Sequence, residues 1–249
     1  MRARDLGIVI GNGEPGPWNA ITDVAGVRVG HETVVEGDVV RTGVTVVFPH
    51  DADPATDPVF AGCHRLNGNG ELTGLEWVRE SGLLTTPIGL TNTHSVGVVR
   101  DALIAWAVDR ALMVEDSWSL PVVGETWDGT LNDINGLHVK PEHVFAAIAA
   151  ASAGPVAEGN VGGGTGMICH EFKGGIGTAS RVVEEGWTVG ALVQANHGRR
   201  RRLRVNGDPV GERMGADVVP LPETGAPEGA GSIIVLLATD APLLPIQCE

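Results

Sequence analysis

The sequence lacks an apolar run long enough to cross a membrane, and basic residues are scarce. A typical apolar run, residues 233–238, falls far short of the roughly 18 to 20 residues that a membrane-spanning helix needs. Asp and Glu number 31 against 17 Lys and Arg, which gives a formal net charge of −14. Nucleic-acid affinity comes mainly from cations that neutralise phosphates. We therefore expect neither a membrane span nor a nucleic-acid partner.

A signal-peptide core and paired cysteines are also missing. The apolar stretch near the N-terminus covers only residues 6–10 before glycines follow, so we expect a cytoplasmic protein. The three cysteines, Cys63, Cys169 and Cys248, have no CxxC spacing and no histidines at metal-ligand intervals. The sequence thus predicts reduced thiols, no metal site and no cofactor.

The remaining composition, with 43% hydrophobic residues in 249, predicts one globular domain over residues 1–249. Short β-branched or apolar runs bounded by Gly, Pro, Asp or Asn indicate strands. These runs are residues 27–29, 43–48, 88–91, 120–123, 188–193 and 232–239. Helical patterns begin at Gly74 after a possible N-cap at Thr73, at Val98 (residues 98–113) and at Pro141. The irregular alternation predicts an α+β fold with helices packed on a mixed or antiparallel sheet.

One local stretch departs from the acidic whole. Residues 199–204 read RRRRLR and lead to Asn206-Gly207, a pair typical of two-residue hairpin turns. Because the chain is acidic overall, a solvated hairpin arm is favoured over an RNA-binding patch.

Glycine is abundant, and much of it lies at residues 11–18, 66–74 and 158–167. The last stretch lacks the Lys-Ser/Thr of a nucleotide phosphate loop, because Met167 and Ile168 follow Gly166. A dinucleotide fingerprint fails as well, since its third glycine would fall on Met167. Two interpretations remain: close backbone packing, or a loop that lies against a substrate.

Ser232 stands where a Gly/Pro/Glu-rich segment, residues 219–231, meets an apolar run that we expect to be a buried strand. A serine hydroxyl is a weak nucleophile unless a base lies within hydrogen-bond reach. If the peptide bond before Ser232 were cut, its new α-amino group, with a pKa of about 8, would supply that base. The alternative is an ordinary serine at the start of a strand.

Several long blocks of the chain resemble the DmpA-type family of L-aminopeptidase D-Ala-esterase/amidases, which includes the β-peptidyl aminopeptidases. The blocks are LNGNGELTGLEWVRESG, TNTHSVGVVRDA, VVGETWDGTLNDINGLHV, GNVGGGTGMICHEFKGGIGTASR, VGALVQANHGRR and GAGSIIVLLATDAPLLP. The resemblance implies a layered α/β/β/α sandwich of the N-terminal-nucleophile kind. It also implies a tetramer of αβ units, no cofactor, and short peptides, amino-acid amides or esters as substrates.

The resemblance further implies residue roles. The bond between Gly231 and Ser232 would be cut, and Ser232 would be the nucleophile of acyl transfer. Asn196 matches the oxyanion-hole asparagine, and Glu125 matches a pocket position that binds the substrate ammonium. Trp127, Gly163 and Gly164 complete the expected substrate-binding set. Without the resemblance, Asn196 reads as a turn cap and Glu125 as a surface charge next to Asp128; His31 and His94 read as satisfied structural histidines.

Three departures from the family stand out. The chain has no tyrosine, and Trp127 stands where one is often found; Ile246 replaces an expected histidine. Residues 1–231 correspond to the α chain and residues 232–249 to only the start of the β chain, so a serine and a glutamate of the family site have no counterpart. We therefore expect a truncated polypeptide or a completing second chain, and little activity from these 249 residues alone.

Two other functions stay open. One is acyl transfer of the related ornithine acetyltransferase type, which Ser232 argues against because that family places threonine at the cut. The other is an unprocessed relative that binds small molecules without turnover.

Overall fold

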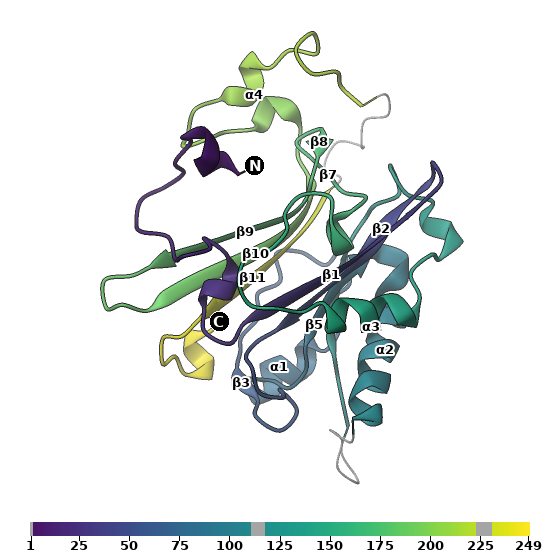
Figure 1. The fold of residues 1–249 in the computed structure, drawn as a ribbon, viewed down its shortest axis with the longest axis vertical. Helices are drawn as coiled ribbons and strands as arrows, with labels where there is room; N and C mark the ends of the chain where they lie inside the picture. The colour runs from purple at the N-terminus through teal and green to yellow at the C-terminus, as the bar shows by residue number, and fades with distance from the viewer. Residues whose placement is uncertain (1, 111–117, 223–230) are drawn as a thin grey trace.

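The computed structural model describes residues 2–110, 118–222 and 231–249. Two sheets lie face to face, and helices α2 (Val96–Asp109) and α3 (Pro141–Ala149) cover the far side of one of them (Figure 1). The α+β class predicted from the sequence is confirmed. The described residues thus stack as sheet, sheet and helices, which are three of the four expected layers.

The sheet beneath the helices has the order β1-β2-β5-β6. Strands β1 (Arg28–Glu36) and β2 (Val40–Phe48) form a long antiparallel hairpin, and β2 also pairs antiparallel with β5 (Ile88–Asn92). Strand β6 (Val122–Thr126) runs parallel to β5, with α2 in the connection between them. Residues 43–48 of β2 are all buried because this strand has the helices on one side and the second sheet on the other.

The second sheet has the order β11-β10-β9, formed by β9 (Gly175–Val182), β10 (Thr188–His197) and β11 (Gly231–Thr239), all antiparallel. Its middle strand buries Leu192 and Gln194 completely. Along β11, Ile234, Leu236 and Ala238 pack against the core between the sheets. The alternate residues Ile233, Val235 and Leu237 are 41%, 51% and 72% exposed. The expectation of a fully buried strand is therefore wrong: among the described residues β11 lies at the edge of its sheet and is half-buried on one face.

The remaining elements are short. They are α1 (Leu75–Ser81), α4 (Val210–Arg213), β3 (Val59–Phe60), β4 (Leu83–Leu84), β7 (Ile168–Cys169) and β8 (Phe172–Lys173). Helix α3 begins with Pro141 in its first turn, as predicted. Thr73 does not cap α1, because Gly74 holds that position and the Thr73 hydroxyl donates to the Pro121 carbonyl. Residues 111–113, predicted to end the second helix, lie outside the described residues, as do residues 223–230 of the Gly/Pro/Glu-rich segment.

The arginine-rich segment is not a solvated arm throughout. Arg200 is only 3% exposed, and its guanidinium lies over the Phe172 ring at 4.4 Å. It donates to the carbonyls of Glu171, Val219 and Pro220. The expectation of a solvated arm is wrong at Arg200, because the groups that bury this side chain are distant in sequence and no local pattern reveals them.

The Asn206-Gly207 turn is as predicted. Val205 and Asp208 exchange two backbone hydrogen bonds of 3.0 Å, and both central residues have positive φ, 50° and 83°.

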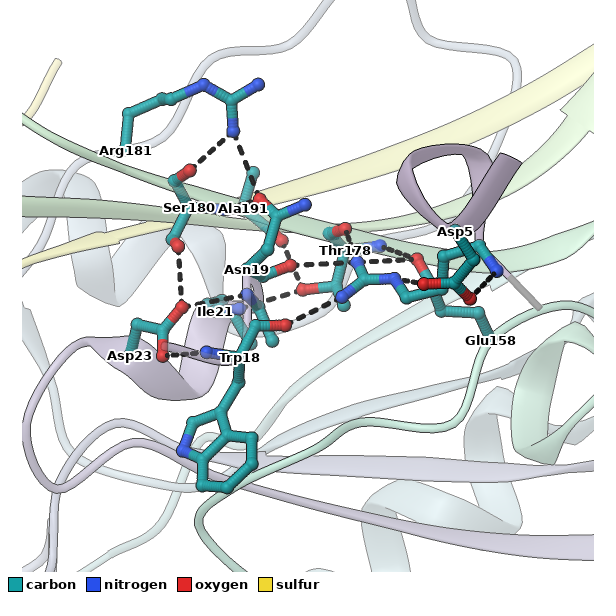
Figure 2. Close-up of polar contacts among 12 residues, drawn as sticks. Asp5, Trp18, Asn19, Ile21, Asp23, Glu158, Thr178, Ser180, Arg181 and Ala191 are labelled. Carbon is teal, nitrogen blue, oxygen red and sulfur yellow. Dashed lines mark hydrogen bonds and ion pairs between the residues drawn. The ribbon is translucent and has the colours of Figure 1, made fainter. Parts of the chain in front are cut away.

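The N-terminal segment is held to the edge of β9 by a polar network (Figure 2). The Asp23 carboxylate accepts from the Trp18 and Ala20 backbone and from the Ser180 hydroxyl. Arg2 forms an ion pair with Glu158 at 2.6 Å. Ile21, which lies within this segment of the chain, packs into the core cluster that includes residues of both sheets.

No helix among the described residues has both the length and the apolar character needed to cross a bilayer.

His31 gives the fold a specific pH dependence. Its Nδ1 lies 2.9 Å from the Thr45 hydroxyl, its buried Nε2 has no hydrogen-bond partner among the described residues, and burial lowers its pKa from 6.5 to about 4. The unfolded chain therefore takes up a proton between these pH values while the folded chain does not, and stability falls as pH decreases from 6.5 to 4. In urea titrations followed by tryptophan fluorescence, His31→Gln should remove about 3 kcal/mol of that loss. If the free energy of unfolding changed with pH in the same way in the wild type and in His31→Gln, the role of His31 would be contradicted.

Candidate active site

Ser232 lies at the start of β11, with its side chain on the inner face that Ile234 also occupies. The backbone N–H of Trp127, just beyond the end of β6, donates to the Ser232 Oγ at 3.1 Å. The hydroxyl therefore sits where the ends of the two sheets meet. Among the described residues no side-chain base bonds to this oxygen, so a base for Ser232 would have to come from elsewhere.

Asn196 lies directly across the ladder from Ser232. The two residues are paired in the β10–β11 register and so point to the same face, with Cβ atoms about 5 Å apart. The Asn196 Oδ1 accepts the Ile168 N–H at 2.9 Å. Because this bond occupies the carbonyl end of the amide, the Nδ2 donors remain available. Asn196 is thus a fixed neutral donor group beside the Ser232 hydroxyl.

The two acidic residues of the GETWDG block are buried. Glu125 in β6 is 7% exposed, and its carboxylate accepts the Glu71 N–H at 3.0 Å and the Thr93 hydroxyl. Asp128 is 1% exposed, and burial raises the pKa of its carboxyl group. The interpretation of Glu125 as a surface charge is therefore wrong. Glu125 thus places a carboxylate, oriented by two hydrogen-bond donors, near the end of β6 and two residues before Trp127.

Trp127 contributes both backbone and side chain. Its N–H binds Ser232, while its indole is 44% exposed and packs over Gly129. The Trp127 backbone thus contacts Ser232, while its indole presents an exposed aromatic surface beside Gly129.

The model of Peptidase family S58 matches residues 19–249. The chain belongs to peptidase family S58. The beta-peptidyl aminopeptidase BapA of Sphingosinicella microcystinivorans is 53% identical over 270 residues, covering 100% of this chain and 67% of that protein. The protein of the same name from Sphingosinicella xenopeptidilytica is 48% identical, covering 100% of this chain and 66% of that protein. The S58 chain therefore spans about two thirds of the length of these curated relatives.

Two solved structures match the S58 chain closely. A Burkholderia sp. beta-aminopeptidase has a TM-score of 0.91 and 62% identity, covering 100% of this chain and 69% of that one. The L-aminopeptidase D-Ala-esterase/amidase from Ochrobactrum anthropi has a TM-score of 0.88 and 48% identity. The match covers 99% of this chain and 69% of that one. It is described as a prototype for the serine aminopeptidases and a new variant among the Ntn hydrolase fold.

These findings confirm the resemblance seen in the sequence and the N-terminal-nucleophile fold. They also confirm the class of activity: this S58 chain is a peptidase of the aminopeptidase kind, acting on peptides or amides.

The structure brings together Ser232, Asn196 and the backbone of Trp127. Glu125 lies two residues before Trp127 in β6, with its carboxylate bonded to Glu71 and Thr93. Gly163 and Gly164 lie apart from them, buried between the sheets. A Cβ on Gly163 would meet the Leu90 carbonyl oxygen at 2.5 Å, and one on Gly164 would meet the Ile176 nitrogen at 2.6 Å. Their N–H groups already bind Thr45 and Val161. Their contacts match the close-packing interpretation, and a role in substrate binding stays a prediction.

Sequence reasoning missed the supports of the site. Thr93 and the Glu71 backbone hold Glu125, and the Ile168 backbone orients Asn196. These pairs are separated by 28 to 54 residues, so no local pattern marks them.

Proposed function

We propose that Ser232 is the nucleophile of this aminopeptidase after cleavage of the Gly231-Ser232 bond. The observation that supports this most is the position of the hydroxyl, held by the Trp127 N–H and directly opposite Asn196. Cleavage would give Ser232 an α-amino group, which is the base that the described side chains do not supply. The flexible backbone of Gly231 allows the distortion that self-cleavage needs.

Turnover then proceeds by acyl transfer. The Ser232 Oγ attacks the substrate carbonyl carbon while its proton passes to the α-amine, which returns it to the leaving amine or alcohol. Water, activated by the same amine, hydrolyses the acyl-enzyme and restores the hydroxyl. The Asn196 Nδ2 donates to the oxyanion that forms at each step.

Glu125 accounts for the requirement for a free amino terminus. Its carboxylate is buried and oriented by two donors, yet each carboxylate oxygen has a further lone pair to offer. A substrate ammonium bound there would form a charge-assisted hydrogen bond in a site largely closed to water. The substrate class is therefore peptides, amides or esters with an unblocked N-terminus.

The assembly and the location are parts of the same proposal. The sequence resemblance supports a homotetramer of αβ units, and the proposed location is the cytoplasm.

Intact mass spectrometry of the protein from its complete reading frame tests the nucleophile. The wild type should give two fragments, one of which begins at Ser232, because the hydroxyl attacks the preceding carbonyl. Ser232→Ala should give one uncut mass, and Ser232→Thr, which keeps a hydroxyl, should still be cut. An uncut wild type would remove the amine base and with it the proposed mechanism.

Asn196→Ala should lower kcat by about 10²- to 10³-fold with a smaller change in KM, because the oxyanion donor acts mainly in the transition state. The rate is normalised to the processed fraction measured by mass. Asn135→Ala removes an exposed amide that is not part of this pairing and should leave kcat unchanged. A loss below about threefold in Asn196→Ala would exclude the oxyanion role.

Glu125→Gln should raise KM for a free amino-acid anilide by about 10- to 100-fold, since a charged hydrogen-bond partner is lost. The preference for that anilide over its N-acetyl derivative should fall by a similar factor. The exposed Glu142→Gln serves as the matched control. An unchanged preference in Glu125→Gln would place ammonium recognition elsewhere.

A further inference from the structure

Three metal-ligating side chains gather at one end of β10, on segments that the sequence separates. Cys169 ends β7, His170 follows it, and His197 is the last residue of β10. One donor atom from each lies within 4.8 Å of the others, and all three residues are partly buried. The two imidazole rings meet edge to face at 5.3 Å.

The backbone brings these groups together at a conformational cost. His170 and Glu171 form the two-residue loop of the β7–β8 hairpin, and both have positive φ, 51° and 63°. Such loops favour Asn and Gly, because other side chains are strained in the left-handed region. The His170 N–H donates to the His197 carbonyl at 2.7 Å, which fixes the hairpin against β10. Strain of this kind is concentrated at functional sites.

His170 is oriented as metal-binding histidines usually are. Its Nδ1 lies 3.1 Å from the Arg199 carbonyl oxygen, so Nδ1 carries the proton. This leaves the Nε2 lone pair free to bind a cation. The hydrogen bond from Nδ1 to the Arg199 carbonyl holds the ring in place, as the corresponding bond does in metal-binding histidines.

The other two donors, Cys169 and His197, are partly buried and stand at the ends of β7 and β10. Metal binding would release the Cys169 thiol proton to solvent.

We propose that Cys169, His170 and His197 form a binding site for a divalent transition-metal ion, with Zn²⁺ as the best match. One thiolate and two imidazoles make a sulfur and nitrogen set that suits zinc, whereas Mg²⁺ and Ca²⁺ prefer oxygen. Bond lengths of about 2.3 Å to sulfur and 2.0 Å to nitrogen require the donors to close by roughly an ångström. Rotation of the Cys169 and His197 side chains would supply this movement, and three protein ligands leave a fourth position open.

The site touches the same residues that orient Asn196. Ile168, which donates to Asn196, precedes Cys169, and His197 follows Asn196 and pairs with Gly231. A bound ion would tie β7 to β10 next to the Gly231-Ser232 bond. The metal site itself does not depend on which residue is the nucleophile.

Spectroscopy and competition with the full-length, tag-free protein test this inference. Zn²⁺ should bind at one equivalent in competition with a chromophoric chelator, and Co²⁺ should give a thiolate-to-cobalt charge-transfer band. Cys169→Ser should abolish that band and weaken Zn²⁺ binding by at least about tenfold, as loss of even an outer-shell partner does. His170→Gln and His197→Gln should weaken binding similarly, while Cys248→Ser, which changes a distant thiol, should match the wild type.

Folding is checked in parallel by circular dichroism and by melting with and without Zn²⁺. An ion that binds only the folded state raises Tm, so Zn²⁺ should raise the Tm of the wild type and Cys248→Ser, and that of Cys169→Ser clearly less. Sub-stoichiometric Zn²⁺ binding, a Co²⁺ spectrum without the thiolate band, or equal affinity in folded Cys169→Ser would overturn the proposal.

Discussion

The pairing of β11 with β10 is the constraint on which the site depends. Its register places Ser232 opposite Asn196 and turns both side chains toward the inter-sheet core. Ile234, Leu236 and Ala238 fix that register because they fill the core from the same face. A slip of one residue would move this whole row to the outer face and turn the serine away from Asn196.

The second constraint is the close approach of the two sheets at the end of β6. Gly124 provides it, because a Cβ there would lie 2.5 Å from the Ile234 Cδ1. The absence of a side chain lets β6 come near enough for the Trp127 N–H to reach Ser232. Glu125, the next residue of the strand, points to the opposite face of β6, where the Glu71 N–H and the Thr93 hydroxyl donate to its carboxylate. Gly124 thus allows the sheet that carries Glu125 to pack closely against the sheet that carries Ser232.

The strands of β-branched residues, such as β2 and β5, could be predicted because their pattern is local. Strand β9, with the sequence GIGTASRV, was missed because its glycines and polar residues do not form an apolar run. The candidate site residues were proposed through resemblance, whereas the groups that hold Glu125 and Asn196 come from distant segments. The gathering of Cys169 with His197 was missed for the same reason: 28 residues separate them, and only the β7–β8 hairpin closes the distance.

The ladder of β11 also decides what a break before Ser232 would do to the molecule as a whole. Every residue from Ser232 to Thr239 keeps a partner on β10, so the two pieces would stay associated in the folded state. Unfolding, in contrast, would let them diffuse apart, and refolding would then require an encounter between two chains. A cut protein of this design would persist through slow unfolding, and its recovery after heating would depend on concentration.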